Sequence, residues 1–266
     1  MSQSIKVAIV GAAGRMGLAL LEHAHALEDM EVVAAIDSPG GDALGRRLGP
    51  DQVPVTGDLA EHIAQCDVVV DFSTPEAAVR AVRMAAGAGC AFVSGTTGLT
   101  ASQQAVFDTC AQSIPVLQAA NFSVGVNVLE RLVELASRAT GDAFDLEVFE
   151  AHHRRKVDAP SGTALFLGEA AARGRDTTLE ASAQWTRHGQ VGPRQDGEIG
   201  FQVVRGGDIV GEHTVFVCGA GERLELTHRA TDRGIFAQGA LRAALWLHAR
   251  RAGVYTMGDV LFSSPS

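Results

Sequence analysis

Short apolar runs alternate with helix-forming stretches through the first half of the chain. The apolar runs are rich in β-branched residues and show little polar alternation; they lie at residues 5–10, 31–36, 67–72, 91–94 and 114–117. Stretches rich in Ala and Leu separate most of them, at residues 17–24, 76–86 and 102–111. Strands without polar alternation, separated by helices, are typical of a parallel sheet that helices cover on both faces. The first half therefore predicts an α/β domain built on a Rossmann-like, doubly wound parallel sheet.

The pattern changes after about residue 121. A helical stretch at residues 126–139 leads into a strand at 145–150 and an alanine-rich helix at 163–172. Three strands then follow one another through glycine-bearing turns, at residues 201–205, 212–218 and 223–229. Consecutive strands without helices between them predict a second, α+β domain with an open mixed or antiparallel sheet. Because a helical tail follows, we expect one domain from residues 1–123, completed by 233–266, and another from 124–232.

Composition and charge argue against several functional classes. The chain carries a formal net charge of −9, and its longest basic run is Arg154-Arg155-Lys156, so we expect no nucleic-acid partner. No stretch approaches the ~18 apolar residues of a membrane span, and the N-terminus lacks a secretory layout. The four cysteines have neither CxxC nor Cys/His zinc spacing, which favours reduced core thiols. We expect a cytoplasmic protein that binds no membrane.

A glycine-rich turn after the first strand indicates a nucleotide site. Residues 11–17 read Gly-Ala-Ala-Gly-Arg-Met-Gly and open a helix. Glycine allows a tight turn and close approach of the backbone to a pyrophosphate, which the helix N-terminus attracts. Asp37 ends the second strand twenty residues after Gly17, where a carboxylate can accept both ribose hydroxyls. The alternatives are a glycine turn of another fold and a turn Asp before Ser38-Pro39.

Small and polar residues recur at the ends of the later strands. Such residues suit recognition of ribose and of the nicotinamide amide, and ligands of open α/β sheets bind at the carboxyl ends of the strands. Each segment alone could be ordinary turn chemistry, but its repetition favours a cofactor site. The expected cofactor contacts are Gly11, Ala12, Ala13, Gly14, Arg15, Met16, Asp37, Phe72, Gly95, Thr96, Thr97, Ala119, Ala120, Asn121 and Phe122.

The densest group of chemically active side chains lies at residues 150–164, EAHHRRKVDAPSGTA. Ser161-Gly162-Thr163 at a helix start predicts an anion site suited to a carboxylate. The alternative is a solvated basic loop with a capped helix. A metal site is not expected, because adjacent side chains such as His152 and His153 point in opposite directions on extended backbone.

The segment EAHHRRKVDAPSGTA resembles the signature of the 4-hydroxy-tetrahydrodipicolinate reductase (dihydrodipicolinate reductase) family of bacterial lysine and diaminopimelate biosynthesis. The resemblance covers nearly the whole chain, through VAIVGAAGRMG, DFSTPE, GTTG, AANFSVGVN, RGGDIVGEH and FAQGALRAALWL. It implies that NADH or NADPH gives hydride to a dicarboxylate substrate after water leaves its 4-hydroxy form, and that the product is tetrahydrodipicolinate. It also implies a homotetramer that assembles through the sheet of the second domain.

The resemblance assigns roles to single residues of the 150–164 segment. His152 matches the proton donor/acceptor of the family and Lys156 its proton donor. His153, Gly162 and Thr163 match substrate-binding positions, with Ser161 in the same turn. An acid or a cation at this place is physically reasonable, because hydride addition to a conjugated imine builds negative charge on the ring nitrogen.

One position departs from the pattern of some relatives. These place Arg directly after the ribose-binding acid, where it can meet the 2′-phosphate of NADPH, whereas here Ser38 and Pro39 follow Asp37. We therefore predict that NADH is used at least as well as NADPH, although Arg15 could still contact the phosphate. Two rival functions are another two-domain NAD(P)-dependent oxidoreductase and a redox-sensing module that binds NAD(H). The first has no reason to carry HHRRK and PSGT together. The second would need a DNA-reading or partner-docking element, and the sequence shows neither a basic recognition helix nor a basic tail.

Overall fold

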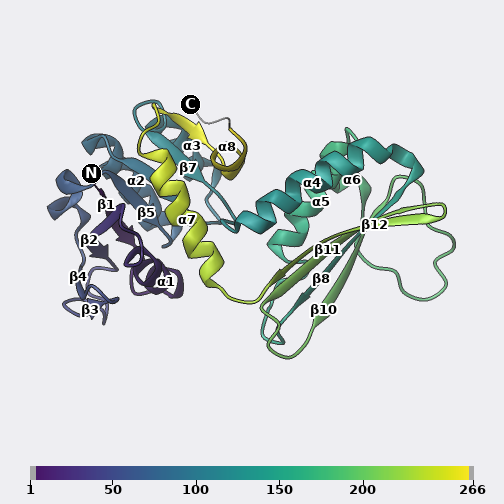
Figure 1. Cartoon of the computed structure of the whole chain (residues 1–266), viewed down its shortest axis with the longest axis horizontal. Coiled ribbons are helices and arrows are strands. Elements are labelled where there is room, and N and C mark those ends of the chain that lie inside the picture. Colours follow the sequence, from purple (N-terminus) through teal and green to yellow (C-terminus); the bar gives the residue numbers. More distant parts are fainter. Residues whose placement is uncertain (1–3, 264–266) are drawn as a thin grey trace. The chain divides into compact units, whose positions relative to one another are not determined.

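The computed structural model describes residues 4–263, which divide into two compact units (Figure 1). Unit 1 comprises the chain up to Ser123 together with the segment from Gly234 onward. Unit 2 is the continuous stretch Val124–Arg233. The chain thus passes between the units twice, after Ser123 and after Arg233.

Unit 1 is built on a sheet with the strand order β13-β7-β6-β5-β1-β2-β4-β3. The pairs from β13 to β4 are parallel, and the edge pair β3–β4 is antiparallel. Its strands are β1 (Ile5–Val10), β2 (Met30–Ile36), β3 (Arg47–Leu48), β4 (Val53–Thr56), β5 (Val68–Asp71), β6 (Ala91–Ser94), β7 (Pro115–Gln118) and β13 (Gly253–Tyr255). Its α-helices are α1 (Arg15–Ala24), α2 (Pro75–Ala88), α3 (Ala101–Cys110), α7 (Gly234–Leu247) and α8 (Met257–Phe262).

Helices cover both faces of this sheet because successive strand residues enter different cores. Val7 and Ile9 of β1 pack in one cluster with α1, α7 and α8, whereas Ala8 and Val10 pack in another with α2 and α3. A strand that is buried on both faces has no polar alternation, which is the pattern seen in the sequence. The predicted doubly wound α/β fold is confirmed.

Unit 2 has a five-stranded mixed sheet in the order β12-β11-β8-β10-β9. Its central strand β8 pairs in parallel with β10 and antiparallel with β11. The strands are β8 (Asp145–His152), β9 (Ala183–Gln184), β10 (Ile199–Arg205), β11 (Gly211–Gly219) and β12 (Glu222–Ala230). The α-helices are α4 (Val124–Thr140), α5 (Gly162–Gly174) and α6 (Leu179–Ser182). The predicted second α+β domain with a mixed sheet is confirmed.

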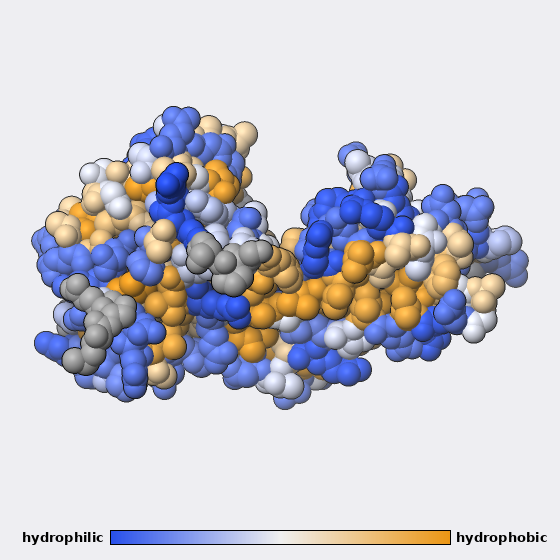
Figure 2. Space-filling view, turned by 45° about the horizontal axis from the view of Figure 1, so that its top comes forward, coloured by the Kyte–Doolittle hydropathy of each residue, from blue (hydrophilic) through white to orange (hydrophobic). Residues whose placement is uncertain are grey.

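Helices α4 and α5 cover one face of the sheet of unit 2. Leu129 and Val133 of α4 form a core with Leu146 and Val148 of β8. The outer side of α4 exposes Val128, Leu132 and Leu135, and Figure 2 shows apolar residues gathered in a band along this unit. Within residues 4–263, no helix is both long and apolar enough to cross a bilayer.

The sequence did not indicate the shortest strands. β3, β9 and β13 have two or three residues each, which is too short for a periodic pattern to be recognised. The sequence also left open the order of the strands in unit 2. β10 and β11 follow each other in the chain, yet they lie on opposite sides of β8.

Candidate functional site

The expected cofactor residues lie in one row along the sheet of unit 1. Strands β7, β6, β5, β1 and β2 are neighbours in the sheet and run in parallel, so their carboxyl ends share one edge. Residues 11–14 follow β1, Asp37 follows β2 and Phe72 follows β5. Gly95–Thr97 follow β6, and residues 119–122 follow β7. In an open α/β sheet this edge is where nucleotides bind, at the point where the strand order reverses.

The turn between β1 and α1 leaves room only for glycine at its first position. Gly11 has a φ of +79°, and a Cβ there would lie 2.4 Å from the carbonyl oxygen of Phe72. Gly14 precedes the first turn of α1, and no side chain caps that helix start. The N–H groups at the start of α1 therefore have no side-chain competitor for an anion. This turn fits the pyrophosphate of a dinucleotide.

Asp37 ties the end of β2 to this turn. Its Oδ2 accepts a hydrogen bond of 2.7 Å from the N–H of Ala13, and its Oδ1 accepts one of 2.7 Å from the N–H of Ser38. The carboxylate therefore has the turn role that the sequence left open as an alternative. Each oxygen keeps a second lone pair, so this role leaves acceptor capacity for ribose hydroxyls.

Aromatic packing joins the segments that follow β5 and β7, the strands on either side of β6. The rings of Phe72 and Phe122 lie 5.4 Å apart and are tilted by 55°. Phe122 is buried, and the N–H of Ser123 donates to the side-chain oxygen of Asn121 over 2.9 Å. The segments after β5 and β7 are thus held together by apolar contact, and the segment after β7 folds back on itself.

Asp71, the last residue of β5, was not expected at this site from the sequence. Its carboxyl group is completely buried and accepts hydrogen bonds of 2.7 Å from Ser94 Oγ and Thr96 Oγ1, and another from Ser73 Oγ. Burial raises the pKa of Asp71 above its usual value, while the three hydroxyl groups act against this rise. Asp71 joins the loops after β5 and β6, which carry the expected contacts Phe72 and Gly95–Thr97.

In unit 2, His152 lies at the end of β8 and contacts a buried carboxylate. Its Nδ1 is 2.6 Å from Oε2 of Glu150, two residues earlier on the same face of the strand. Arg205 at the end of β10 donates to both oxygens of Glu150 over 2.7 Å each. Burial lowers the pKa of His152, with the nearby Lys156 and Arg205 acting in the same direction and Glu150 against it. His152 is therefore neutral at neutral pH in the absence of a ligand.

A second histidine packs edge-on against the first. The ring centroids of His152 and His213 are 5.1 Å apart, and Nε2 of His213 lies 3.0 Å from Oγ of Ser161. Burial lowers the pKa of His213 to about 3, so its ring is neutral too. In the sheet, His213 of β11 is the register partner of Glu150.

The predicted anion-binding turn starts helix α5. Oγ of Ser161 accepts from the N–H of Ala164 over 3.1 Å and caps the helix, and the N–H of Ser161 donates to Oε1 of Glu150 over 2.9 Å. Ser161 is buried, whereas Gly162 is exposed and Thr163 is partly exposed. The structure thus brings together His152 and the start of α5 through Glu150.

Lys156 and His153 occupy the loop between β8 and α5. Nζ of Lys156 is 2.9 Å from Oδ1 of Asp158. Nε2 of His153 lies 3.2 Å from Nη2 of Arg233, so the two adjacent histidines have different partners. Arg154 and Arg155 are exposed. The loop places one ammonium group and several guanidinium groups in unit 2, which suits an anionic ligand.

Four functional candidates were missed in the sequence: Asp71, Glu150, Arg205 and His213. A signal existed for Glu150, since its spacing of two from His152 puts both on one face of a strand. Arg205 and His213 come from β10 and β11 and meet Glu150 only through strand pairing. Both residues lie in the segment RGGDIVGEH, which carries part of the family resemblance, but no local pattern in this segment indicates a contact with Glu150.

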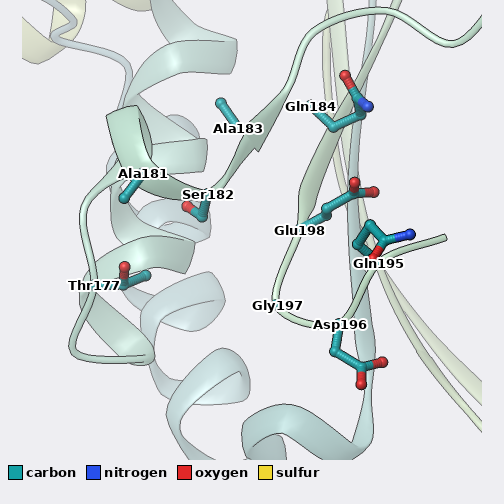
Figure 3. Close-up of a pocket in the computed structure, with 9 residues that line it drawn as sticks. All are labelled: Thr177, Ala181, Ser182, Ala183, Gln184, Gln195, Asp196, Gly197 and Glu198. Carbon is teal, nitrogen blue, oxygen red and sulfur yellow. The ribbon is translucent and has the colours of Figure 1, made fainter.

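Residues 4–263 contain no group of three or more His, Cys, Asp or Glu side chains that could hold a metal ion. A cavity of about 450 Å³ lies outside the candidate site, beside β9 and the start of β10 (Figure 3). Residues 177, 181–184 and 195–198 line it, and none of them is an expected site residue.

Comparison with known proteins identifies the family. Residues 5–122 match the family model for the N-terminus of dihydrodipicolinate reductase, and residues 125–261 match the model for its C-terminus. A 4-hydroxy-tetrahydrodipicolinate reductase from Acinetobacter baumannii (strain AYE) is 49% identical over 267 residues, which cover 98% of this chain and 97% of the relative. One from Anaeromyxobacter dehalogenans (strain 2CP-1 / ATCC BAA-258) is 47% identical, covering 96% of this chain and 97% of the relative.

A solved structure agrees with these relatives. The dipicolinate-bound dihydrodipicolinate reductase from Paenisporosarcina sp. TG-14 superposes with a TM-score of 0.79 and 25% identity, covering 96% of this chain and 98% of the other. The matched family models together span nearly all of the residues described. The chain therefore belongs to the dihydrodipicolinate reductase family of oxidoreductases.

Proposed function

We propose that this chain reduces 4-hydroxy-tetrahydrodipicolinate to tetrahydrodipicolinate, with loss of water, using NADH or NADPH in lysine and diaminopimelate biosynthesis. Family membership supports the reaction class. Within the chain, the observation that carries the proposal is the junction at Glu150, which joins His152 to the start of α5. A proton-transferring ring and an anion-binding helix start then act on one dicarboxylate molecule.

The residues at the sheet edge of unit 1 hold the cofactor in this proposal. The turn from Gly11 to Met16 takes the pyrophosphate, and Asp37 takes the ribose of the adenosine half. Phe72, Gly95–Thr97 and Ala119–Phe122 bound the nicotinamide half. When bound, the nicotinamide supplies the hydride. The support for this placement is the glycine-only space at Gly11 and the shared strand edge.

The loop and the helix start in unit 2 hold the substrate. The Ser161 hydroxyl is used within the protein, so in this proposal Gly162 and Thr163 contact a substrate carboxylate. His153 and Arg233 add positive or polar contacts near the second carboxylate. Helix N-termini and cations both favour a dianion, which explains how a protein of net charge −9 attracts one.

Lys156 delivers the proton. Reduction of the conjugated imine adds one hydride to a ring carbon and one proton to the delocalised anion that forms. The ammonium group of Lys156 stabilises that anion through its positive charge and then donates a proton to it. Burial keeps the ring of His152 neutral, so its Nε2 can accept a proton from the substrate.

We expect NADH to be used at least as well as NADPH. The carboxylate of Asp37 attracts a 2′-hydroxyl and repels a 2′-phosphate, and Ser38 and Pro39 supply no offsetting charge. Steady-state kinetics with both cofactors give the two values of kcat/KM, and Asp37→Ala should lower the NADH value more than the NADPH value. A preference for NADPH above ~10-fold, about 1.4 kcal/mol in apparent barrier, contradicts this expectation.

We also propose a homotetramer in the cytoplasm. The face of the unit 2 sheet opposite α4 and α5, with Phe149, Val204 and Phe216, has partly exposed apolar side chains that suit assembly. The four cysteines of the chain are free thiols, which fits a reducing compartment. Light scattering tests the assembly, since a tetramer has four times the 27.8 kDa mass of one chain.

The decisive test of the reaction uses the purified chain. Enzymatically generated 4-hydroxy-tetrahydrodipicolinate is mixed with NADH or NADPH, and the loss of cofactor absorbance is followed. We expect substrate-dependent oxidation of either cofactor, and formation of tetrahydrodipicolinate in equal amount. Cofactor binding without substrate-dependent oxidation would instead support the redox-sensing module, and turnover only with another carbonyl or imine substrate would support a different oxidoreductase.

A further inference from the structure

Glu150 is a completely buried carboxylate with an unusual number of partners. Its side chain is surrounded by Nδ1 of His152 at 2.6 Å, two guanidinium nitrogens of Arg205 at 2.7 Å and the N–H of Ser161 at 2.9 Å. The partners come from β8 itself, from β10 and from the start of α5. A carboxylate that receives donors from three elements cannot turn without breaking several hydrogen bonds, so its orientation is fixed.

The partners keep this carboxyl group ionised. Burial by itself would raise the pKa of Glu150, but the hydrogen bonds from Arg205, His152 and Ser161 together lower it below its ordinary value. The bidentate pair with Arg205 supplies the compensating charge that a buried anion requires. At neutral pH the side chain of Glu150 therefore accepts hydrogen bonds and donates none.

An accepting carboxylate decides the tautomer of His152. The hydrogen bond to Oε2 requires the proton of the neutral ring on Nδ1, which leaves a lone pair on Nε2. Within residues 4–263, Nε2 of His152 makes no hydrogen bond to the protein. Gly211 keeps the space beside this atom open, because a Cβ at that position would lie only 3.0 Å from it. Nε2 is thus the ring atom left for a ligand.

The same carboxylate also orients the anion-binding turn. Its Oε1 accepts from the backbone of Ser161, the N-cap residue of α5, whose hydroxyl caps the helix. Any displacement of Glu150 therefore moves both the ring of His152 and the first residue of the turn. The two groups that contact the substrate in the proposed function share one support.

We propose that Glu150, clamped by Arg205, is the positioning residue that holds His152 as the Nδ1–H tautomer with Nε2 facing the substrate. The proposal rests on the proposed function for its kinetic test but not for its spectroscopic one. The charged and titratable groups around His152 are Glu150, Lys156, Arg205 and His213. Of these, Glu150 is the one that contacts the ring through a hydrogen bond.

The test replaces the carboxylate by an amide of the same shape. Glu150→Gln keeps the volume but removes the charge, and its amide can donate to Nδ1 as well as accept from it. We expect kcat to fall by ~10-fold to 100-fold, with KM changed by less than ~3-fold. We also expect the Nε2–H tautomer to become populated, and the pH at which kcat is half-maximal to shift.

The matched control is Glu134→Gln. Glu134 of α4 is also a largely buried carboxylate paired with arginines, with Arg138 at 2.9 Å and Arg173 at 3.5 Å. It is not a partner of His152, so kcat and the tautomer of His152 should stay as in the wild type. Circular dichroism and thermal unfolding establish that both variants are folded. If Glu150→Gln fails to fold, the same measurements are made on Glu150→Asp, which keeps the charge but has a side chain shorter by one methylene group.

Nitrogen-15 NMR of the imidazole rings provides the readout that a merely structural role would not move. The chain has nine histidines, and the signals of His152 are those lost in His152→Asn. The proposal expects a protonated Nδ1 and an unprotonated Nε2 in the wild type. A wild-type Nε2–H tautomer overturns it, as does a Glu150→Gln variant with unchanged kcat, or one whose kcat falls while the tautomer stays the same.

The two proposals fail in different ways. If the wild-type chain does not reduce the substrate, the proposed function is wrong, and the NMR spectra still decide what Glu150 does to His152. If the wild type is active and Glu150→Gln is equally active, the positioning role is wrong and the function stands.

Discussion

Two completely buried carboxylates, Asp71 in unit 1 and Glu150 in unit 2, lie near the carboxyl ends of central strands. Both are removed from water, and burial disfavours the charged form of each. Asp71 receives three neutral hydroxyl groups, and its pKa stays above the ordinary value. Glu150 receives a guanidinium, a backbone N–H and an imidazole, and its pKa falls below it.

The difference shows that the charge of the neighbouring group, more than burial itself, decides whether a buried carboxyl group is protonated or ionised. Hydroxyl groups can donate or accept, so they stabilise either form of Asp71 and join two loops without requiring a charge. A guanidinium only donates, so Arg205 holds Glu150 ionised. The first arrangement suits a cofactor site, where loops are shaped around a ligand. The second suits a reaction site, where one ring needs a defined proton position.

The largest expected effect comes from variants of the proposed proton-transfer groups in unit 2, which should lower kcat without changing NADH binding. Lys156→Met and His152→Ala each remove a group that acts in the transition state, so kcat should fall ~10²-fold or more. Thr163→Val removes a proposed substrate contact that would act in the ground state as well, so it should mainly raise KM. The Kd of NADH should change by less than ~2-fold in all three, since the expected cofactor residues lie in unit 1.

Lys6→Met is the control for these variants, because it removes the other lysine of the sequence, on β1. Steady-state kinetics and direct NADH titration are the measurements. Near wild-type kcat in both Lys156→Met and His152→Ala would make Arg154 or Arg155 the next candidate for the acid. A collapse of NADH binding would mean that the loop is structural.

Alanine substitutions at two glycines of unit 1 test whether the close approach of Gly11 to Phe72 contributes to stability and to NADH binding. Gly11 and Gly40 have nearly the same φ, +79° and +81°, but a Cβ meets the Phe72 backbone at Gly11 and open space at Gly40. Gly40→Ala should cost only the left-handed backbone penalty of about 1 kcal/mol. Gly11→Ala should cost about 2 kcal/mol or more and weaken NADH binding by ~10-fold or more, because the turn must move. Urea unfolding and NADH titration measure both, and equal costs would mean that the close approach to Phe72 has no energetic weight.

The pH dependence of stability tests the contrast between the two carboxylates, with the smallest expected effect. The raised pKa of Asp71 means that the wild type loses unfolding free energy as pH rises from about 3.8 to the pKa of Asp71 in the folded state. Asp71→Asn lacks this loss, so its stability should increase relative to that of the wild type over that range. A lowered pKa at Glu150 means that stability is lost as pH falls from about 4.5 to the folded value. As pH rises through that range the wild type gains unfolding free energy and Glu150→Gln does not, so the stability of the variant should fall relative to that of the wild type.

Each slope is at most about 1.4 kcal/mol of unfolding free energy per pH unit. Chemical denaturation of the wild type and both variants between about pH 3.5 and 7 measures them. Slopes of the same sign for Asp71→Asn and Glu150→Gln would remove the contrast on which this comparison stands.

Local sequence was enough to predict the parts of the fold that depend on neighbours in the chain. The β-branched runs and the glycine turn predicted β1, α1 and the position of Asp37, because strand, turn and helix there are consecutive. The Ser161 cap was also predictable, since an N-cap residue acts within three residues of itself. The family resemblance added the roles of His152 and Lys156, which stay predictions.

What could not be predicted depends on strand register. Arg205 reaches Glu150 across 55 residues of sequence, and His213 reaches Ser161 across 52. Both contacts require β10 and β11 to flank β8 with a particular alignment, which no local pattern encodes. Asp71 lies within the apolar run 67–72 and was missed for the same reason, because its partners Ser94 and Thr96 lie at and just after the end of the next strand, β6.

The split course of unit 1 has a consequence for the order in which the chain can fold during synthesis. Unit 2 is continuous and ends at Arg233, so all of its residues are synthesised before those of α7 and β13. Until then, the nascent unit 1 lacks Leu241 and Leu247 from its core, and the β7 edge lacks its partner β13. Exposed apolar surface and an unpaired strand edge are features that chaperones bind and that promote aggregation. Unit 2 is therefore the second unit to be started but the first that can be finished, and unit 1, which carries the expected cofactor residues, is completed only after α7 and β13 have been made.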